Sequence, residues 1–181
     1  IVGKLENLKV ALEIDISTGD EITPNELNFE YISIFENKKI YIDTYNIETI
    51  LAEKIETILR RGKYNTRMKD YYDIYYLANK FDFDGATLRK ALKKTFENRG
   101  HAFTMEQFEQ VMAFAENDAM QKKWKAFCKK IDTKTDDFNA VLRTIKKFLT
   151  EPYKAAVADI KYTKIWLANN NSWIQGGNDN D

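Results

Sequence analysis

Cysteine and histidine are almost missing from this chain, since Cys128 and His101 are the single examples of each among 181 residues. No disulfide can form within the chain, and a zinc site built on Cys and His ligands is excluded by number alone. Cys128 falls on the same helical stripe as Met120 and Trp124, which indicates a small core residue rather than a nucleophile. His101 follows a glycine between two helical stretches, where we expect a loop residue and not a catalytic base.

Proline, glycine, net charge and long apolar runs are scarce as well. The chain has 2 Pro and 7 Gly, which favours helices over many short strands. No apolar run approaches the roughly 20 residues of a membrane span, and no signal peptide is visible. Lys+Arg and Asp+Glu both number 28, so bulk charge would not drive non-specific nucleic-acid binding, whereas a local basic patch stays open. These absences predict a reduced, soluble, cytoplasmic chain that makes no contact with a membrane.

The composition that is present describes a packed globular protein. Hydrophobic residues make up 44% of the sequence and aromatic residues 13%, which is typical of a folded core and not of a disordered tail. The length suits one sizeable domain or a large lobe of a bigger one. The sequence opens IVGKLENLKV, without Met, and runs at once into a strand pattern. We therefore expect a piece of a longer protein.

Strand patterns occupy the first quarter of the chain. Residues 8 to 17 alternate strictly, which predicts a half-buried strand with Val10, Leu12 and Ile14 turned toward the core. Residues 27 to 35 are rich in β-branched and aromatic side chains, and a turn then leads to a third strand at 40 to 43.

Helical periodicity begins at Ile47. Helices are predicted at 47 to 61, 67 to 79, 85 to 97, 104 to 116, 119 to 131 and 136 to 149. Thr135 or Asp136 is the expected N-cap of the last of these. Near the end of the chain, the pattern YTKIWLANNNSWIQ indicates a short hairpin that carries Trp166 and Trp173.

A small, mainly antiparallel sheet followed by a helical bundle predicts an α+β fold. The expected division has a β-rich part at 1–46, a helical domain at 47–159, and a C-terminal hairpin and tail at 160–181.

Lys54 is the most informative residue, because it interrupts the apolar face of its predicted helix. Ile50 and Ile58 lie one turn to either side of it. The next helix repeats the anomaly, since Asp70 and Asp73 share a face with apolar residues. A lysine and two carboxylates on consecutive apolar faces can satisfy one another across a helix pair, or they can converge on a ligand. A buried ion pair contributes little net stability after desolvation, so function is the better explanation for three charges there.

Lys54 and Asp70 also have purely structural explanations. Lys54 could lay its methylenes on the core and keep its ammonium group in water. Asp70 could interact with the free N–H groups in the first turn of its own helix.

Two further charge patterns have a functional and a structural interpretation. Glu13 and Asp15 project from the same face of the predicted strand, where paired carboxylates could hold Mg²⁺ or could simply be solvated. Five cations surround the turn between the two anomalous helices and could form an anion-collecting rim or a solvated connection. These cations are Arg60, Arg61, Lys63, Arg67 and Lys69.

Two stretches together resemble a known family. They are LEIDISTGDEITP at 12 to 24 and ETILAEKIETILRRGKYNTRMKDYYDIYYL at 48 to 77. They are similar to the AbiEii/AbiGii toxins, which are nucleotidyltransferases with a DNA-polymerase-β-like catalytic fold. These toxins belong to type IV toxin–antitoxin and abortive-infection systems, which confer phage resistance. The resemblance is specific from about Leu8 to Leu77 and loose through the helical half.

The resemblance implies a role for each matching residue. Lys54 is expected to contact the triphosphate of the nucleotide, with Arg67 as a supporting contact. Either Asp70 or Asp73 is the essential aspartate of the last motif. Asp15 is implied as a metal-binding carboxylate, and Glu13 is its neighbour on the strand. The implied cofactor is Mg²⁺, because two metal ions would clamp the attacking and leaving oxygens while a lysine neutralises the departing phosphates.

One departure from the family limits these expectations. Such enzymes carry a Gly-Gly or Gly-Ser turn, a helix and then an Asp-x-Asp pair, which supply triphosphate contacts and two metal carboxylates. The Asp-x-Asp spacings in this sequence are Asp82–Asp84 and Asp179–Asp181, which fall in a predicted loop and in the tail. We therefore expect the C-terminal portion of such an enzyme, inactive on its own.

The leading hypothesis is a nucleotidyltransferase toxin that, in its intact form, transfers nucleotides from an NTP to an acceptor such as tRNA, with a cognate antitoxin as partner. The alternative is a non-catalytic helical binding module that docks an antitoxin or an RNA through its basic turns. An upstream Asp-x-Asp would favour the enzyme. The sequence leaves open the nucleotide preference, the acceptor, the oligomeric state and the choice between Asp70 and Asp73.

Overall fold

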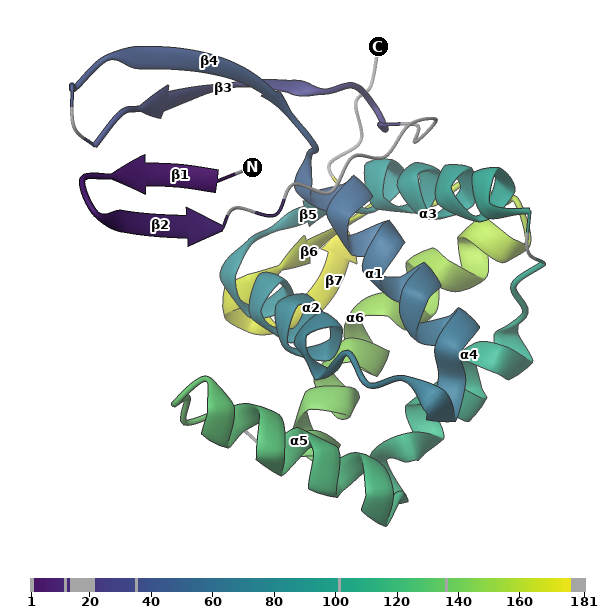
Figure 1. The fold of residues 1–181 in the computed structure, drawn as a ribbon. Coiled ribbons are helices and arrows are strands. Elements are labelled where there is room, and N and C mark those ends of the chain that lie inside the picture. Colours follow the sequence, from purple (N-terminus) through teal and green to yellow (C-terminus); the bar gives the residue numbers. More distant parts are fainter. Residues whose placement is uncertain are drawn as a thin grey trace, which may run out of the picture.

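The computed structural model describes residues 2–11, 13, 22–34, 36–100, 102–135 and 137–176. Helices form one body, and two β-hairpins project from it (Figure 1). A third sheet, of three short strands, lies within the helical body. The predicted α+β class is confirmed.

Helix α1 (Ile47–Arg61) has the predicted bounds because both of its ends are specified locally. The Asn46 side chain accepts a hydrogen bond from the Thr49 backbone N–H at 2.8 Å, which satisfies one of the free donors of the first turn. At the other end, Gly62 has a φ of 50°, a conformation that suits glycine. The apolar face of α1 includes Leu51 and Ile55, at most 1% exposed.

The remaining helices complete the body, and each predicted helix is found, although α4 ends four residues before its predicted end and α6 extends beyond its own. They are α2 (Met68–Lys80), α3 (Gly85–Arg99), α4 (Met105–Met112), α5 (Asp118–Lys130) and α6 (Phe138–Val157). Short 3₁₀ turns lie at η1 (Gly62–Tyr64), η2 (Ala113–Glu116) and η3 (Ala168–Asn170). Helix α1 packs on α3 and α2, while α6 runs behind them and contacts both.

The last helix differs from its prediction at both ends. Its N-cap is Asp137, whose side chain accepts from the Ala140 backbone N–H at 2.8 Å, instead of Thr135 or Asp136. It also continues eight residues beyond the predicted end, through Pro152 to Val157. Proline has no N–H to donate to Phe148 O, four residues earlier. The indole Nε1 of Trp173 donates to that oxygen at 2.8 Å, so the helix passes the proline without leaving a carbonyl unpaired.

The C-terminal hairpin was predicted, but its integration into the core was not. Strands β6 (Lys164–Leu167) and β7 (Ser172–Gln175) pair antiparallel, and β6 also pairs with the two-residue strand β5 (Phe83–Asp84). Trp166 is 0% exposed and belongs to the same hydrophobic cluster as the helices. A strand of two residues carries no detectable period, which explains why β5 was missed.

The N-terminal hairpin corrects the prediction of one long half-buried strand. The chain forms β1 (Val2–Leu5) and β2 (Leu8–Ala11), which pair antiparallel. Glu13 lies beyond β2, whereas Leu12, Ile14 and Asp15 fall outside the described residues. Val10 was expected in the core but is 46% exposed. Among the residues described, β1 and β2 pair only with each other.

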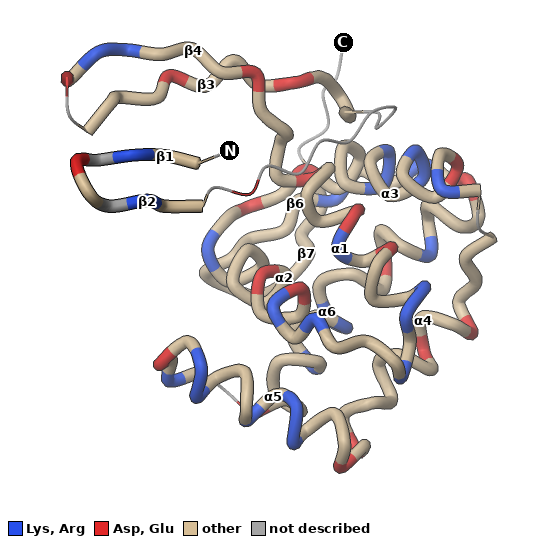
Figure 2. The backbone as a smooth tube through the Cα atoms, viewed as in Figure 1, with Lys and Arg blue, Asp and Glu red and all other residues tan. Residues whose placement is uncertain are grey.

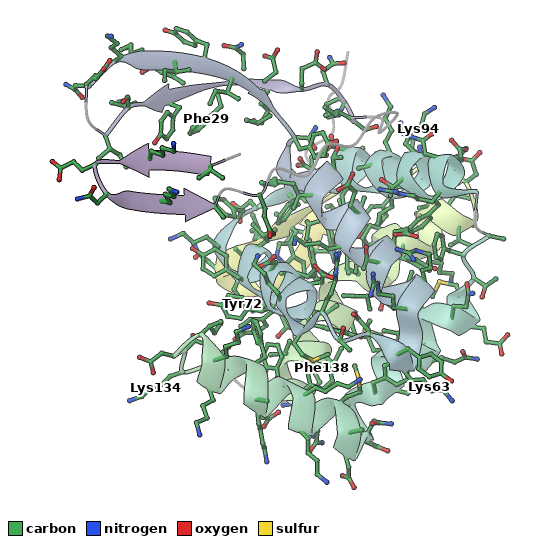
Figure 3. All side chains as sticks on the ribbon, in the orientation of Figure 1. Phe29, Lys63, Tyr72, Lys94, Lys134 and Phe138 are labelled. Atoms are coloured by element: carbon green, nitrogen blue, oxygen red, sulfur yellow. The ribbon has the colours of Figure 1, made fainter. Side chains whose placement is uncertain are left out.

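The second hairpin is amphipathic and its apolar face is open. Strands β3 (Leu27–Ile32) and β4 (Lys39–Thr44) pair Phe29 with Ile42 and Tyr31 with Ile40. These four side chains share one face and are 40–56% exposed. Phe29 projects on the side that faces the β1–β2 hairpin (Figure 3). The strand predicted at 27 to 35 begins as expected but ends earlier, at Ile32.

Within the described part of the chain, every helix is too short or too polar to cross a membrane.

Candidate active site

Lys54 projects from the middle of α1 toward two carboxylates on α2. Its Nζ lies 2.6 Å from Asp73 Oδ2 and 3.5 Å from Asp70 Oδ1. The three side chains are only 12–20% exposed, so the cluster is largely shielded from solvent. Acidic and basic segments both occur on α2 (Figure 2). The prediction that Lys54 faces at least one of these aspartates is confirmed, and both are close.

The two carboxylates have different surroundings. Asp73 Oδ2 also accepts from Lys69 Nζ at 2.7 Å, so two ammonium groups meet at one oxygen. Asp70 has only the longer contact to Lys54, and its Oδ2 is buried with no hydrogen-bond partner among the described residues. An unpaired buried carboxylate oxygen is costly, commonly by about 1–3 kcal/mol or more. Asp70 is therefore the carboxylate with unused capacity to bind a ligand or a proton.

Tyr71, next to Asp70 in the chain, adds a buried phenol beside the cluster. Burial raises the pKa of Tyr71 well above its ordinary value, and the negative charge of Asp70 also raises it. The phenol therefore stays neutral over the physiological pH range. Its ring packs edge-on against the ring of Phe138 of α6, with 5.2 Å between the two ring centres, and this contact packs α2 against the core.

A short turn sets the position of α2 relative to α1. After η1, the buried Asn65 accepts a hydrogen bond from the Arg67 backbone N–H at 2.8 Å through its side-chain oxygen. Lys123 of α5 reaches across and donates to Asn65 O at 3.2 Å and to Lys63 O at 3.4 Å. The turn before Asp70 is thus stabilised by a hydrogen bond within the turn and by hydrogen bonds from Lys123 of α5.

A surface cleft of about 470 Å³ opens at the start of α2. The exposed Arg67 lines it together with Lys69 and Asp70, and α5 contributes Phe127 and Lys130 to the opposite wall. Arg67 and Asp70 thus line the same cleft. Lys69 was predicted as one of five cations that could collect anions, but its pairing with Asp73 and the contribution of α5 were not predicted. The four-residue spacing of Lys69 and Asp73 was a usable signal, whereas nothing local to α5 pointed to the cleft.

The residues predicted to bind metal do not form a centre in the described part of the chain. Glu13 is exposed beyond β2, and Asp15 lies outside the described residues. No group of three or more His, Cys, Asp or Glu side chains positioned to hold a metal ion occurs among the residues described. Asp82 and Asp84 are structural: Asp82 accepts from the Ala168 backbone N–H, and Asp84 caps α3 through Thr87 N.

The geometry as a whole defines a class of site. A shielded lysine, an unpaired carboxylate and a cleft lined with Arg and Lys suit the handling of phosphate groups.

Comparison with known proteins agrees with this class. Residues 2–150 match the family described as nucleotidyl transferase AbiEii toxin, type IV TA system. The match spans most of the chain, which therefore belongs to this family of nucleotidyltransferase toxins. Membership implies an NTP substrate and a cognate antitoxin, and enzymes of this kind typically use a divalent metal. No curated protein and no solved structure gives a significant match.

Proposed function

We propose that Lys54 contacts the triphosphate of an NTP and that Asp70 is the essential aspartate of the same site. In the intact protein, one nucleotide passes from the NTP to an acceptor such as a tRNA end. The single observation that carries this proposal is the asymmetry of the cluster. Lys54 is aimed at two carboxylates, and only one of them is neutralised at close range by a second lysine.

The reaction makes specific demands on these residues. An acceptor hydroxyl attacks the α-phosphorus, the bond from that phosphorus to the bridging oxygen breaks, and pyrophosphate leaves with the electron pair. Negative charge grows on the leaving group, and the Lys54 ammonium offsets it. Asp73 holds Lys54 in place through Oδ2, which also accepts a hydrogen bond from Lys69. Asp70 Oδ2, without a partner among the described residues, is free to accept a hydrogen bond or a proton.

Arg67 and Lys69 extend the positive charge to the cleft at the start of α2. Arginine suits phosphate recognition because its planar fork donates two parallel hydrogen bonds. We propose Arg67 as the second contact to the nucleotide.

The proposed metal is Mg²⁺, which would supply charge neutralisation at the reacting phosphate when bound. Asp15, with Glu13 beside it, is the proposed ligand from this chain. No group of three or more carboxylates is placed to hold the ion within the described part of the chain. We propose that an Asp-x-Asp element outside these 181 residues completes the metal site. Residues 1–46 would then be the β-rich end of the catalytic domain, 47–159 the helical domain and 160–181 its C-terminal hairpin and tail.

The biological setting that we propose follows from the family. The protein would act in the cytoplasm as the toxin of a two-gene system that limits phage infection, restrained by its antitoxin. The alternative function is a non-catalytic binding module for the antitoxin or an RNA. It is favoured by the fact that Lys54 and Lys69 already satisfy Asp73 within the protein, as a structural ion-pair network would.

A transfer assay with labelled NTPs, Mg²⁺ and total tRNA tests the proposal. In the intact protein, Lys54→Ala should lower the transfer rate about 10²- to 10³-fold, the loss expected when one well-placed electrostatic group is removed. Lys147→Ala, on the exposed surface of α6, is the matched control and should transfer normally.

The 181-residue chain alone should transfer nothing. Metal-dependent labelling by this chain would overturn the proposal that carboxylates from elsewhere are needed. A fully active Lys54→Ala protein would return Lys54 to a structural role and favour the binding module.

A further inference from the structure

A second basic cleft, of about 630 Å³, lies on the other side of the η1 turn. It is formed where the end of α1 and η1 meet α4, and its polar lining comprises Arg60, Arg61, Lys63, Tyr64, Gln107 and Gln110. Lys63 lies toward α4, whereas Tyr72 of α2 lies toward α5 (Figure 3). The five cations that the sequence groups around one turn are therefore divided between two clefts, with Arg67 and Lys69 in the first.

The charge of this second cleft is positive and largely uncompensated. Arg60 pairs with the buried Glu56 of its own helix at 2.7 Å. The Nε of Arg61 is buried and has no hydrogen-bond partner among the described residues. None of the described residues that line the cleft is acidic. A guanidinium group with an unused donor and an ammonium group, both lining one cleft, suit an anion with several acceptor oxygens.

The same cleft presents an aromatic ring and amides, which a simple anion does not require. Tyr64 is 78% exposed, and Lys63 Nζ lies 5.3 Å from the centre of its ring. Gln107 and Gln110 reach the cleft from one side of α4, three residues apart. A flat exposed ring stacks on a nucleobase, and amide groups can both donate to and accept from base edges.

The position of Arg61 links the second cleft to the active site. Arg61 follows Lys54 by seven residues, which is two turns along the same face of α1 or about 10 Å. A strand of one or two nucleotides covers such a distance.

We propose that this second cleft binds a nucleotide unit, with its phosphate on Arg61 and Lys63 and its base against Tyr64. The unit could come from a free nucleotide or from single-stranded RNA, because the phosphate and base are common to both. The inference rests on the proposed function in one respect, namely that a strand held here would lead the acceptor toward Lys54.

Binding of a fluorescent single-stranded RNA of about eight nucleotides, followed by anisotropy without NTP or divalent metal, tests the proposal. Arg61→Ala/Lys63→Ala should weaken binding about tenfold or more and lower the slope of log affinity against log salt by about 1.4, for two phosphate contacts. Tyr64→Ala should weaken binding about fivefold or more, whereas Tyr64→Phe should retain it. The matched control, Arg143→Ala/Lys147→Ala, removes the same two charges from the exposed face of α6 and should leave the slope unchanged.

A competing nucleoside monophosphate separates the two sources. Displacement of the strand by the monophosphate supports a cleft for free nucleotides, and its failure to displace supports a strand site. The proposal is overturned if the chain does not bind RNA. It is equally overturned if the Arg61/Lys63 and Tyr64→Ala variants keep normal affinity and salt dependence.

Lys54→Ala distinguishes this inference from the proposed function. It should bind the strand as tightly as the unaltered chain, since Lys54 lies outside the second cleft. If the unaltered intact protein binds RNA normally but transfers no nucleotide, the proposed function is contradicted while the proposal for the second cleft is retained.

Discussion

At the level of single residues, the two aspartates that face Lys54 differ in the ion pairs and hydrogen bonds that each makes. Asp73 accepts from two lysines at 2.6 and 2.7 Å, so its charge helps to hold α1 and α2 together. Asp70 has one contact at 3.5 Å and a buried oxygen without a partner among the described residues. A carboxylate that contributes little to the fold and is costly to bury is the better candidate for a role in chemistry.

This difference predicts opposite behaviour for two isosteric substitutions. Asp73→Asn should lower the free energy of unfolding by about 1–3 kcal/mol, because charge-assisted hydrogen bonds are weakened. Asp70→Asn should leave stability unchanged or higher and should abolish transfer in the intact protein. Urea denaturation and the transfer assay measure the two effects. A destabilised Asp70→Asn protein with normal transfer would assign Asp70 a structural role.

Several residues of this site can be predicted from the sequence alone. Lys54 and the two aspartates could be found because a charge inside an apolar helical stripe is visible in the spacing alone. The choice between Asp70 and Asp73 could not be made from spacing, because it depends on where Lys69 and Lys54 meet in three dimensions. Phe127 and Lys130 join the first cleft through the packing of α5, some sixty residues away in the chain, and no local pattern encodes that contact.

At the level of secondary-structure elements, the two tryptophans of the C-terminal hairpin donate hydrogen bonds to backbone carbonyls of two helices. Trp166 Nε1 donates to Ala78 O at 2.7 Å, in the last turn of α2, where backbone carbonyls have no partner within the helix. Trp173 Nε1 donates to Phe148 O, the carbonyl that Pro152 leaves free. The hairpin thus provides hydrogen-bond donors for one carbonyl group in each of two helices. Because Phe148 O is paired in this way, α6 can continue past the end that its sequence predicts.

A double-mutant cycle tests this compensation. Trp173→Phe should lower the free energy of unfolding by about 1–3 kcal/mol, because Phe148 O then has no donor. In the background of Pro152→Ala, whose N–H can donate to Phe148 O, the same Trp173→Phe substitution should cost less. Chemical denaturation of the four proteins gives the coupling free energy. A coupling of zero would mean that Trp173 stabilises the fold through packing alone.

Helix α3 is tied to the segment after α6 by an exposed ion-pair group. Asp159 lies 2.7 Å from Lys93 Nζ and 3.1 Å from Arg89 Nη1. Hydrogen bonds from Lys93 and then Arg89 lower the pKa of Asp159 below its ordinary value. A carboxyl group whose pKa is lower in the folded state stabilises the fold above its unfolded pKa, about 3.9, and loses this effect as the pH falls through the folded value.

Asp159→Asn should therefore be less stable than the unaltered chain at pH 7, by a small amount because the pair is exposed. The difference between the two proteins should shrink as the pH falls below about 4. Thermal unfolding over this pH range, repeated at high salt, measures it. Added salt should also reduce the difference at pH 7, since exposed pairs are screened. A difference that persists at low pH would contradict an ionic origin.

At the scale of the whole molecule, helices and hairpins differ in how completely they are buried. The helical body encloses a continuous core, whereas the β3–β4 hairpin exposes Phe29, Tyr31, Ile40 and Ile42 on one face. The alternating pattern of the early strands correctly predicted strand structure, but burial did not follow. Alternation reports which side chains share a face, while burial depends on whether another layer covers that face.

Equilibrium binding shows whether Lys54 contacts the triphosphate of an NTP, as we propose. The affinity of the chain for a labelled NTP is compared with its affinity for the monophosphate of the same nucleoside, before and after Lys54→Met. We predict that the unaltered chain prefers the triphosphate and that Lys54→Met lowers this preference about tenfold or more, as expected for the loss of a charged hydrogen-bond donor. An unchanged preference in a folded Lys54→Met protein would contradict the claim.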